Sequence, residues 1–267
     1  MYLYPTFVLA KERLCGIMVV MWIAECLQSH CAATIDGGDV LFYTVERRVQ
    51  FNMNKWIFFD VGYTLIDETQ MWVHRVSETR ELAHQIGREV TDSEIMAKIM
   101  ECATAYIPIA PTTARWLGLP DMAKYRGEFE ELYDGADSVL ADLKAKGYKL
   151  GVIANQPENL DGRLQKLGIL KYFDVVVSSH DCGVVKPDER IFLLALTRAN
   201  AAPEECYMVG DRLDNDIAPA KKLGFNTVWV RQGICAGQQP RDDYSTPDYV
   251  AEGIAEVQKI FDKLANA

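Results

Sequence analysis

The sequence predicts an α/β fold, a doubly wound parallel sheet that carries an inserted helical cap domain. Short apolar runs alternate with stretches of helical periodicity from Lys55 onward, the pattern of a parallel sheet covered by helices on both faces. A purely helical block at 68–134 interrupts this alternation. The chain has 267 residues, 49% of them hydrophobic, which is enough to bury a large core.

The first predicted strand is the apolar run 56–59, which ends at Asp60 as a buried parallel strand should. Helical periodicity follows at 69–87 and 92–105. Prolines interrupt it at 107–120, and a further helical stretch is predicted at 121–133. The remaining elements are a helix between Gly135 and Gly147, strand 148–154, helix 157–167, strand 173–178, helix 187–200, strand 206–210, helix 213–223, strand 226–230, a short run Asp248–Val250 and a last helix at 252–265.

The predicted core comprises residues 53–67 and 135–267, the cap 68–134, and an N-terminal extension of unknown role 1–52. Within the extension, the apolar run Leu14–Ala24 is too short to cross a bilayer as a helix. Its length and basic flank fit a weak signal-peptide core, although no convincing cleavage site follows. An appended helix and an upstream segment foreign to the enzyme are the alternatives. We favour the last, because a start at Met53 would leave two residues before an apolar strand, a natural opening for a domain.

The composition restricts the partners and the compartment. A net charge of −10 and a pI near 5.0 argue against nucleic acid as the main partner, but allow a small phosphate ester. No segment predicts membrane insertion, and the oligomeric state is not indicated. The seven cysteines are odd in number and form no C-x-x-C, which indicates reduced thiols and a cytoplasmic protein. The four histidines lack metal-ligand spacing.

Polar residues follow the predicted strands at the points where the strands end. Asp60 follows the first core strand, Asn155 the second and Asp211 the fourth, and Lys186 lies in the loop after the third. In an open parallel sheet, ligands bind beyond the carboxyl ends of the strands. Helix capping could explain Asp60 or Asp211 singly. Helix capping does not readily explain why polar residues follow all four strands, so the sequence predicts a site at this edge of the sheet.

Four segments in the same order resemble the motifs of the haloacid dehalogenase superfamily, subfamily I with a helical cap. The first motif of that superfamily is an apolar strand followed by Asp-x-Asp-x-Thr, and the third contains a Lys-Pro pair. The matching segments are WIFFDVGYTLID (56–67), KLGVIANQ (149–156), GVVKPDERIF (183–192) and VGDRLDND (209–216).

The resemblance implies a phosphohydrolase in which Asp60 is the nucleophile and forms an aspartyl-phosphate. It implies a Mg²⁺ ion held by Asp60, the backbone carbonyl of Gly62 and Asp211, with Asp216 as a ligand or as an anchor behind the ligands. Mg²⁺ suits such oxygen ligands, and a cation offsets the repulsion between Asp60 and the phosphate. Lys186 would neutralise the remaining negative charge. Thr64 and Asn155 would orient the loop and bind the phosphate.

Two departures from the superfamily pattern concern the chemistry. The second aspartate of the first motif, which protonates the leaving group and later activates water, is Gly62 here. Losing such a group typically costs about 10²–10⁴-fold in rate. The hydroxyl residue of the second motif is Ala154. Asp67 could act as a substitute acid, but a structural role at the entry to the cap is favoured.

The cap resembles lids that exclude water and select substrates. Tyr63 stands where relatives have a small residue, and it could narrow the entrance or pack under the cap. Other conceivable substrate contacts are Trp72, Arg80, Arg115 and Trp116, each of which could equally be cap core or solvated surface.

The leading function is a Mg²⁺-dependent phosphatase for a small phosphorylated metabolite, slow because of Gly62. Haloacid dehalogenation needs no metal, so Asp211 and Asp216 argue against it. Phosphonate hydrolysis requires a cap lysine, for which Lys98 and Lys124 are nominal candidates. A non-catalytic protein that binds phosphorylated ligands is the alternative from another class.

Overall fold

The computed structural model describes residues 31–36, 39–44 and 55–266. The chain divides into two compact units, Met1–Asn52 and Met53–Ala267. The apolar run Leu14–Ala24 lies outside the described residues. In the first unit, β1 (Cys31–Asp36) pairs antiparallel with β2 (Asp39–Thr44). The sequence was not expected to form strands there, although the Gly37-Gly38 dipeptide between two short runs is a hairpin signal.

The second unit is built on a six-stranded sheet in the order β10-β9-β8-β3-β6-β7, in which every pair of neighbours is parallel. The predicted doubly wound sheet is therefore confirmed. Its middle strand β3 is completely buried, which explains its continuous apolar sequence. The strands are β3 (Trp56–Phe59), β6 (Lys149–Ala154), β7 (Val175–Ser178), β8 (Cys206–Gly210), β9 (Asn226–Val230) and β10 (Tyr249–Ala251).

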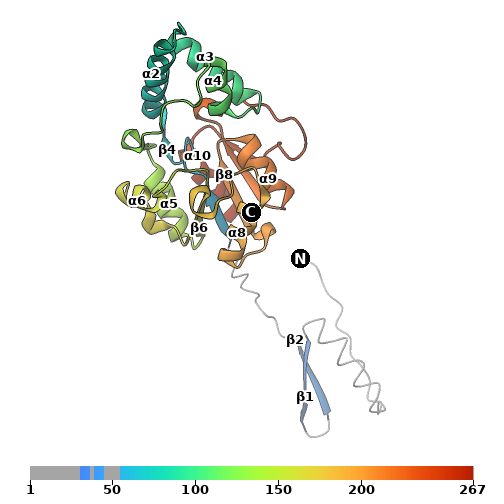
Figure 1. The fold of residues 1–267 in the computed structure, drawn as a ribbon. Helices are drawn as coiled ribbons and strands as arrows, with labels where there is room; N and C mark the ends of the chain where they lie inside the picture. Colours follow the sequence, from blue (N-terminus) through green and yellow to red (C-terminus); the bar gives the residue numbers. More distant parts are fainter. Residues whose placement is uncertain (1–30, 37–38, 45–54, 267) are drawn as a thin grey trace. The chain divides into compact units, whose positions relative to one another are not determined.

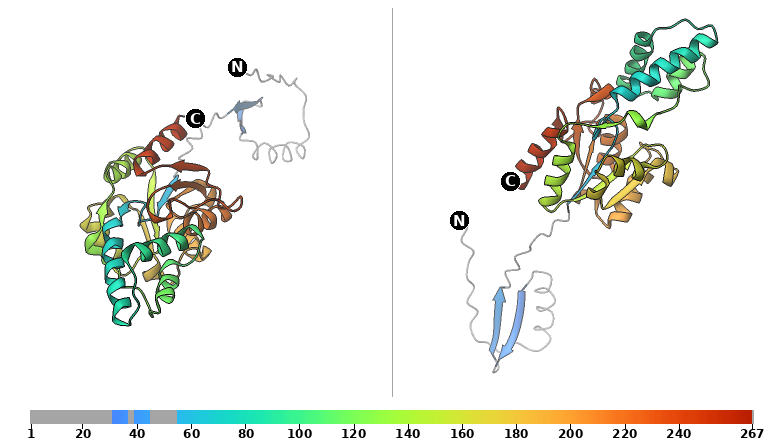
Figure 2. Two further views of the ribbon diagram at one scale, coloured as in Figure 1. Left: turned by 90° about the horizontal axis from the view of Figure 1, so that it is seen from above. Right: turned by 90° about the vertical axis from the view of Figure 1, so that its left-hand side faces the viewer.

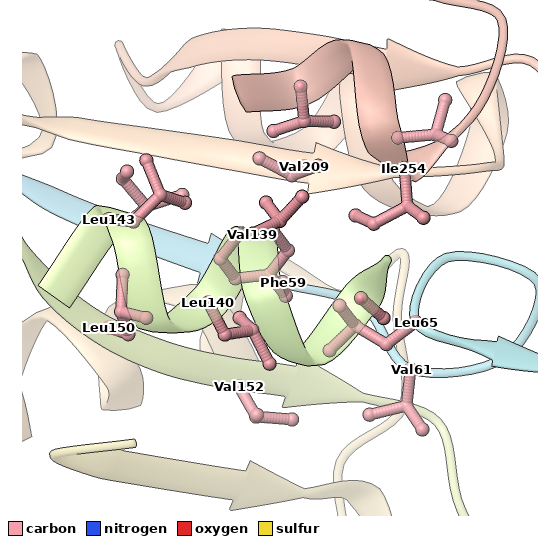
Figure 3. Close-up of a cluster of buried hydrophobic side chains, with 14 of the residues drawn as sticks. Phe59, Val61, Leu65, Val139, Leu140, Leu143, Leu150, Val152, Val209 and Ile254 are labelled. Atoms are coloured by element: carbon pink, nitrogen blue, oxygen red, sulfur yellow. The ribbon is translucent and has the colours of Figure 1, made fainter. Parts of the chain in front are cut away.

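Helices cover both faces of this sheet, and two neighbouring phenylalanines show how. Successive side chains of a strand point to opposite faces. Phe59 packs in a cluster with α5 (Ala136–Ala145), α6 (Leu160–Lys166) and α10 (Ile254–Ala265). Phe58 faces the other cluster, with α8 (Glu189–Ala199) and α9 (Ala218–Lys222). Figure 3 shows the first cluster, where Val139, Leu140 and Leu143 of α5 pack over Phe59 and Val152.

Several short helical elements join the strands and helices of the second unit. A four-residue helix, α7 (Ser179–Cys182), follows β7 directly. A π-helical turn, η4 (Leu213–Ile217), precedes α9 and occupies the first half of the helix predicted at 213–223. The 3₁₀ turns are η1 (Gly127–Phe129), η2 (Leu170–Tyr172), η3 (Pro203–Glu205) and η5 (Gly233–Cys235). Among the described residues, no helix is both long and apolar enough to cross a membrane.

Three helices form a group beyond one end of the sheet, where Figures 1 and 2 show them together. They are α2 (Thr69–Gln85), α3 (Asp92–Thr104) and α4 (Ile109–Leu117), and they share a hydrophobic cluster of their own. Two short strands, β4 (Ile66–Asp67) and β5 (Glu131–Leu132), pair where the chain leaves and re-enters the core. All of these helices lie inside 68–134, and the division into separate core and cap domains stays a prediction.

Helix α4 lies in the region that the sequence analysis treated as an interruption. Pro108 is its N-cap, and Pro111 falls in its first turn. The first backbone N–H groups of a helix have no partner within the helix, so prolines are tolerated there. Gly118 ends the helix with φ of 80°. The prolines therefore mark the beginning of a helix and not a break.

The helical stretch predicted at 121–133 is wrong. The structure has only η1 and β5 in this interval. The backbone of Ala123 bonds to α2 side chains instead: its N–H donates to Thr79 Oγ1 over 3.0 Å, and its carbonyl accepts from Arg75 Nε over 2.8 Å. These tertiary hydrogen bonds replace those that a helix would make.

Candidate active site

The polar residues predicted at the strand ends come together in the structure. Asp60 directly follows β3, Asp211 directly follows β8, and Asp216 lies in the π-helical turn after β8. Lys186 comes from the loop between α7 and α8. All four are buried and line one cavity of about 260 Å³. Sequence order therefore predicted which residues meet.

Lys186 binds the two flanking acidic residues with its ammonium group. Its Nζ lies 2.5 Å from Asp60 Oδ1, 2.6 Å from Asp216 Oδ1 and 2.8 Å from the carbonyl oxygen of Ile153. The three partners use all three N–H groups. Burial alone would lower the pKa of Lys186, but Asp216 and Asp60 outweigh that effect, so the pKa is raised and the charge is retained.

Asp60, Asp211 and Asp216 form a compact acidic cluster, with one carboxylate oxygen from each within 4.8 Å of the others. Burial, and next the charges of Asp216 and Asp60, raise the pKa of Asp211 well above its usual range. Burial likewise raises the pKa of Asp216 to about 6, even though Lys186 acts in the opposite direction. One ammonium group cannot balance three carboxylates. The donor set therefore fits a hard divalent cation such as Mg²⁺.

The three carboxylates differ in how many of their oxygens are engaged. Both oxygens of Asp216 have protein partners, because Oδ1 accepts from Lys186 and Oδ2 accepts from the backbone N–H of Arg212 over 3.0 Å. Asp60 receives Lys186 on Oδ1. Among the described residues, Asp211 has no donor to its carboxylate, while Trp229 Nε1 holds its backbone carbonyl over 2.8 Å. This pattern favours Asp60 and Asp211 as ligands and Asp216 as an anchor.

Asn155 holds the lysine loop. Its Nδ2 donates to the carbonyl of Lys186 over 2.9 Å, and its Oδ1 accepts from the backbone N–H of Lys186 over 2.7 Å. Both ends of the amide are thereby engaged. Asn155 also lines the cavity, but these bonds favour a positioning role over the phosphate-binding role expected from the sequence.

Gln232, which was not predicted from the sequence, holds the backbone of the loop that follows Asp60. Gln232 Nε2 donates to the carbonyl oxygens of Tyr63 (2.7 Å) and Thr64 (3.2 Å). Tyr63 packs in the cluster of the three outer helices and also lines the cavity, so both roles weighed for it are compatible. Thr64 is fully buried and does not line the cavity, and its hydroxyl has no partner among the described residues.

The outer helices complete the cavity. Trp72 and Arg75 of α2 line it, and the Arg75 guanidinium lies 5.2 Å from the centre of the Trp72 ring. Arg80 instead forms ion pairs with Glu81 and Asp92. Arg115 and Trp116 are not among the lining residues. Of the four residues proposed from the sequence, Trp72 alone lines the cavity, and Arg75 was missed.

The cavity also contains an acidic residue outside the expected motifs, Glu68. It is 8% exposed, and its Oε1 accepts a hydrogen bond from the Tyr125 hydroxyl over 3.0 Å. Burial raises the pKa of Glu68 to about 7; Tyr125 lowers it, and the charges of Asp60 and Glu130 raise it further. Tyr125 also contacts Glu130, which pairs with Arg163. An acid at the start of a helix gives no distinctive sequence signal, because such residues are common there.

The family model of haloacid dehalogenase-like hydrolases matches residues 57–230, which include every residue of this cluster. The chain belongs to this family. As a haloacid dehalogenase-like hydrolase, it also resembles an experimental structure, that of a phosphatase of the same superfamily from Thermococcus onnurineus. The two are 25% identical with a TM-score of 0.56, over 78% of this chain and 97% of the other.

Relatives of this hydrolase include proteins named as phosphatases. A glyceraldehyde 3-phosphate phosphatase of Methanopyrus kandleri is 36% identical over 50% of this chain, and that of Pyrococcus abyssi is 32% identical over 68%. A phosphoserine phosphatase of Thermus thermophilus is 33% identical over 52% of this chain. The matches span 58%, 83% and 58% of these three relatives respectively.

Proposed function

We propose that this hydrolase is a Mg²⁺-dependent phosphatase that transfers the phosphoryl group of a small phosphorylated metabolite to Asp60 and then to water. The observation that carries the proposal is the arrangement of Asp60 in the cavity wall. One of its carboxylate oxygens is held by Lys186, and the carboxylate of Asp211 lies beside it. A nucleophile, a fixed cation and a free anionic ligand thus meet in one place.

Each residue has a definite task in this reaction. The Asp60 carboxylate attacks phosphorus, and the Lys186 ammonium offsets the charge that the two anions bring together. Asp216 holds Lys186 from the other side over 2.6 Å, and Asn155 fixes the lysine backbone. Asp60, Asp211 and the Gly62 carbonyl would hold Mg²⁺, which would neutralise the phosphate charge that opposes attack.

The substrate class follows from the cavity and from the relatives. The cavity of about 260 Å³ suits a small molecule. Two of the relatives are named for glyceraldehyde 3-phosphate and phosphoserine, both small phosphate monoesters. The cavity adds an apolar and a cationic contact through Trp72 and Arg75. A short phosphorylated metabolite therefore fits best.

The competing functions have less support. Phosphonate hydrolysis would need a lysine in the cavity beside Lys186, yet neither Lys98 nor Lys124 lines it. Lys98 lies 2.7 Å from Glu101 in an ion pair on α3. The non-catalytic alternative rests on Gly62 and Ala154 alone. A protein that only binds phosphorylated ligands does not require a buried carboxylate in the cavity wall, whereas Asp60 provides one here.

The test measures phosphate release by the full chain from p-nitrophenyl phosphate, acetyl phosphate and a panel of phosphorylated metabolites, with Mg²⁺ and with a chelator. We expect turnover that depends on Mg²⁺ and is lost in Asp60→Asn. The matched control is Asp67→Asn: Asp67 lies outside the cavity and accepts the Thr69 N–H over 2.8 Å, which asparagine can also do. Binding of phosphate esters without turnover of any of them would favour the non-catalytic alternative.

A further inference from the structure

The space beside Gly62 is filled by the carboxyl group of Glu68. A Cβ atom added to Gly62 would lie 2.5 Å from Oε1, 2.8 Å from Cδ and 3.0 Å from Oε2 of Glu68. Gly62 has no positive φ, so its backbone conformation does not require glycine. What excludes a side chain at this position is Glu68. The glycine and the glutamate are therefore complementary.

Helix capping, the usual reason for an acid at the start of a helix, does not explain Glu68. Glu68 is the N-cap residue of α2, but its side chain makes no capping hydrogen bond. Its carboxyl group lies instead in the wall of the cavity that also contains Asp60. A buried carboxylate costs stability unless it is paired or takes up a proton. Of the cations near Glu68, Arg163 pairs with Glu130, and Arg75 donates from Nε to the Ala123 carbonyl.

The contacts of Tyr125 allow a proton on Glu68. The Tyr125 hydroxyl carries one proton and contacts both Glu130 and Glu68. Arg163 Nε donates to Glu130 Oε2 over 2.9 Å, which identifies Glu130 as the charged carboxylate that also receives the tyrosine proton. Tyr125 has one proton for two carboxyl groups, so while it donates to Glu130 a protonated Glu68 can donate across the 3.0 Å contact in its place. The network thus accommodates a neutral Glu68 beside the nucleophile.

We propose that Glu68 is the acid–base residue of the reaction and supplies the carboxyl group that Gly62 lacks. This inference rests on the proposed phosphatase function. In the first step Asp60 attacks phosphorus, the bond to the ester oxygen breaks, and that oxygen takes the proton of Glu68. In the second step the Glu68 carboxylate takes a proton from water, whose oxygen attacks phosphorus. The bond to Asp60 breaks, inorganic phosphate leaves, and Glu68 is protonated again.

Glu68→Gln keeps the size and the contact with Tyr125 but removes the transferable proton. The full chain is assayed on p-nitrophenyl, phenyl and benzyl phosphate, whose leaving groups need increasing help from an acid. We expect kcat/KM to fall about 10²–10⁴-fold on benzyl phosphate and less than about 10-fold on p-nitrophenyl phosphate. Because water activation is also lost, the variant should release a burst of p-nitrophenol and accumulate phospho-Asp60, detected as a phosphorylated chain by mass spectrometry.

Two further variants distinguish chemistry from structure. Glu130→Gln removes a buried acid that contacts the same tyrosine but does not line the cavity. It should lower the melting temperature and leave the leaving-group dependence unchanged. The double variant Gly62→Asp/Glu68→Ala moves the carboxyl group to position 62. Its kcat/KM on benzyl phosphate should be at least about 10-fold higher than that of Glu68→Gln. Gly62→Asp alone keeps Glu68 and should not exceed the wild type on benzyl phosphate, because the Glu68 carboxyl group occupies the space that the new side chain needs.

The outcomes separate this inference from the proposed function. Persistent turnover in Asp60→Asn overturns the phosphatase mechanism itself. If Asp60→Asn is inactive while Glu68→Gln slows all three substrates equally and shows no burst, Glu68 has only a structural role. If Glu68→Gln does not fold, the double variant decides: inactivity on benzyl phosphate, in a folded chain that still cleaves p-nitrophenyl phosphate, contradicts the inference.

Discussion

Asp211→Asn tests the metal site, and we expect it to stabilise the metal-free protein, whereas most substitutions destabilise a protein. In the folded protein without a divalent cation, the Asp211 carboxylate lies within 4.8 Å of two other acids, which Arg212 and Lys186 offset only in part. Asparagine has nearly the same size and removes the charge. We therefore expect the variant to be more stable than the wild type without metal, and to lose its response to Mg²⁺.

The magnitude follows from the geometry. Two unit charges 4.8 Å apart repel by about 3.5 kcal/mol at an effective dielectric constant of about 20. Arg212 and Lys186 together cancel roughly one of the two repulsions on Asp211, and relaxation of the structure reduces the other, which leaves about 2 kcal/mol. For a unit of this size, 1 kcal/mol corresponds to about 2–4 °C in melting temperature. Asp211→Asn should therefore melt about 4–8 °C higher than the wild type in a chelator.

Magnesium should largely remove this difference. A cation at about 100 times its dissociation constant stabilises the wild type by about 2.7 kcal/mol, or about 5–10 °C. The variant lacks a charged ligand and should shift by less than about 2 °C, and its Mg²⁺-dependent turnover should disappear. Thermal unfolding with chelator and with increasing Mg²⁺ measures both effects.

Asp214→Asn is the matched control, because Asp214 is a neighbouring acid that pairs with Arg212 and accepts from Gln238. It should lower the melting temperature and keep the full Mg²⁺ shift. An Asp211→Asn chain that melts lower than the wild type in a chelator would refute the electrostatic argument. An unchanged Mg²⁺ shift in that chain would refute the assignment of Asp211 as a ligand.

Three further predictions concern other parts of the molecule. A chain of residues 53–267 should be soluble and melt no lower than the full chain, because these residues form a compact unit; aggregation or a clearly lower melting temperature would show that 1–52 is structural. Asn155→Ala removes both bonds to the Lys186 backbone, so it should cost about 1–3 kcal/mol in urea unfolding and lower kcat more than it raises KM; an unchanged kcat contradicts the positioning role. Burial would raise the pKa of Asp248, but Lys221 and Thr227 lower it below the usual value, so its ionised form contributes stability that is lost as pH falls through the lowered pKa. Asp248→Asn should cost about 1 kcal/mol at pH 7 and progressively less as the pH falls below about 4, and a pH-independent difference would refute this.

The sequence by itself determined the sheet and the residues that meet at its edge. Buried parallel strands are apolar throughout, so the runs ending at Asp60 and Gly210 were recognisable without the structure. Because parallel strands end at the same edge, strand order was enough to predict that Asp60, Asp211 and Lys186 would lie together. The family motifs fall at the same positions. Local pattern and topology carried this part of the prediction.

Tertiary packing decided where the local signal was weak or misleading. The prolines near 108 were read as a break, but they begin α4, because first-turn positions need no N–H donor. The segment 121–133 has helical periodicity, yet its backbone bonds to Arg75 and Thr79 on α2. In both cases the outcome depended on which partners the backbone groups found, and a periodic pattern does not record that.

The same limit applies to the site. The sequence indicates only that Gly62 replaces the second aspartate of the first motif, and that Glu68 precedes a predicted helix. Only the structure shows that the Glu68 carboxyl group occupies the space that a side chain at Gly62 would need. Asn155 and Gln232 likewise act through backbone contacts across the fold. Sequence spacing determines which residues a strand presents at its end, whereas packing between distant segments determines which side chain reaches the reacting atoms.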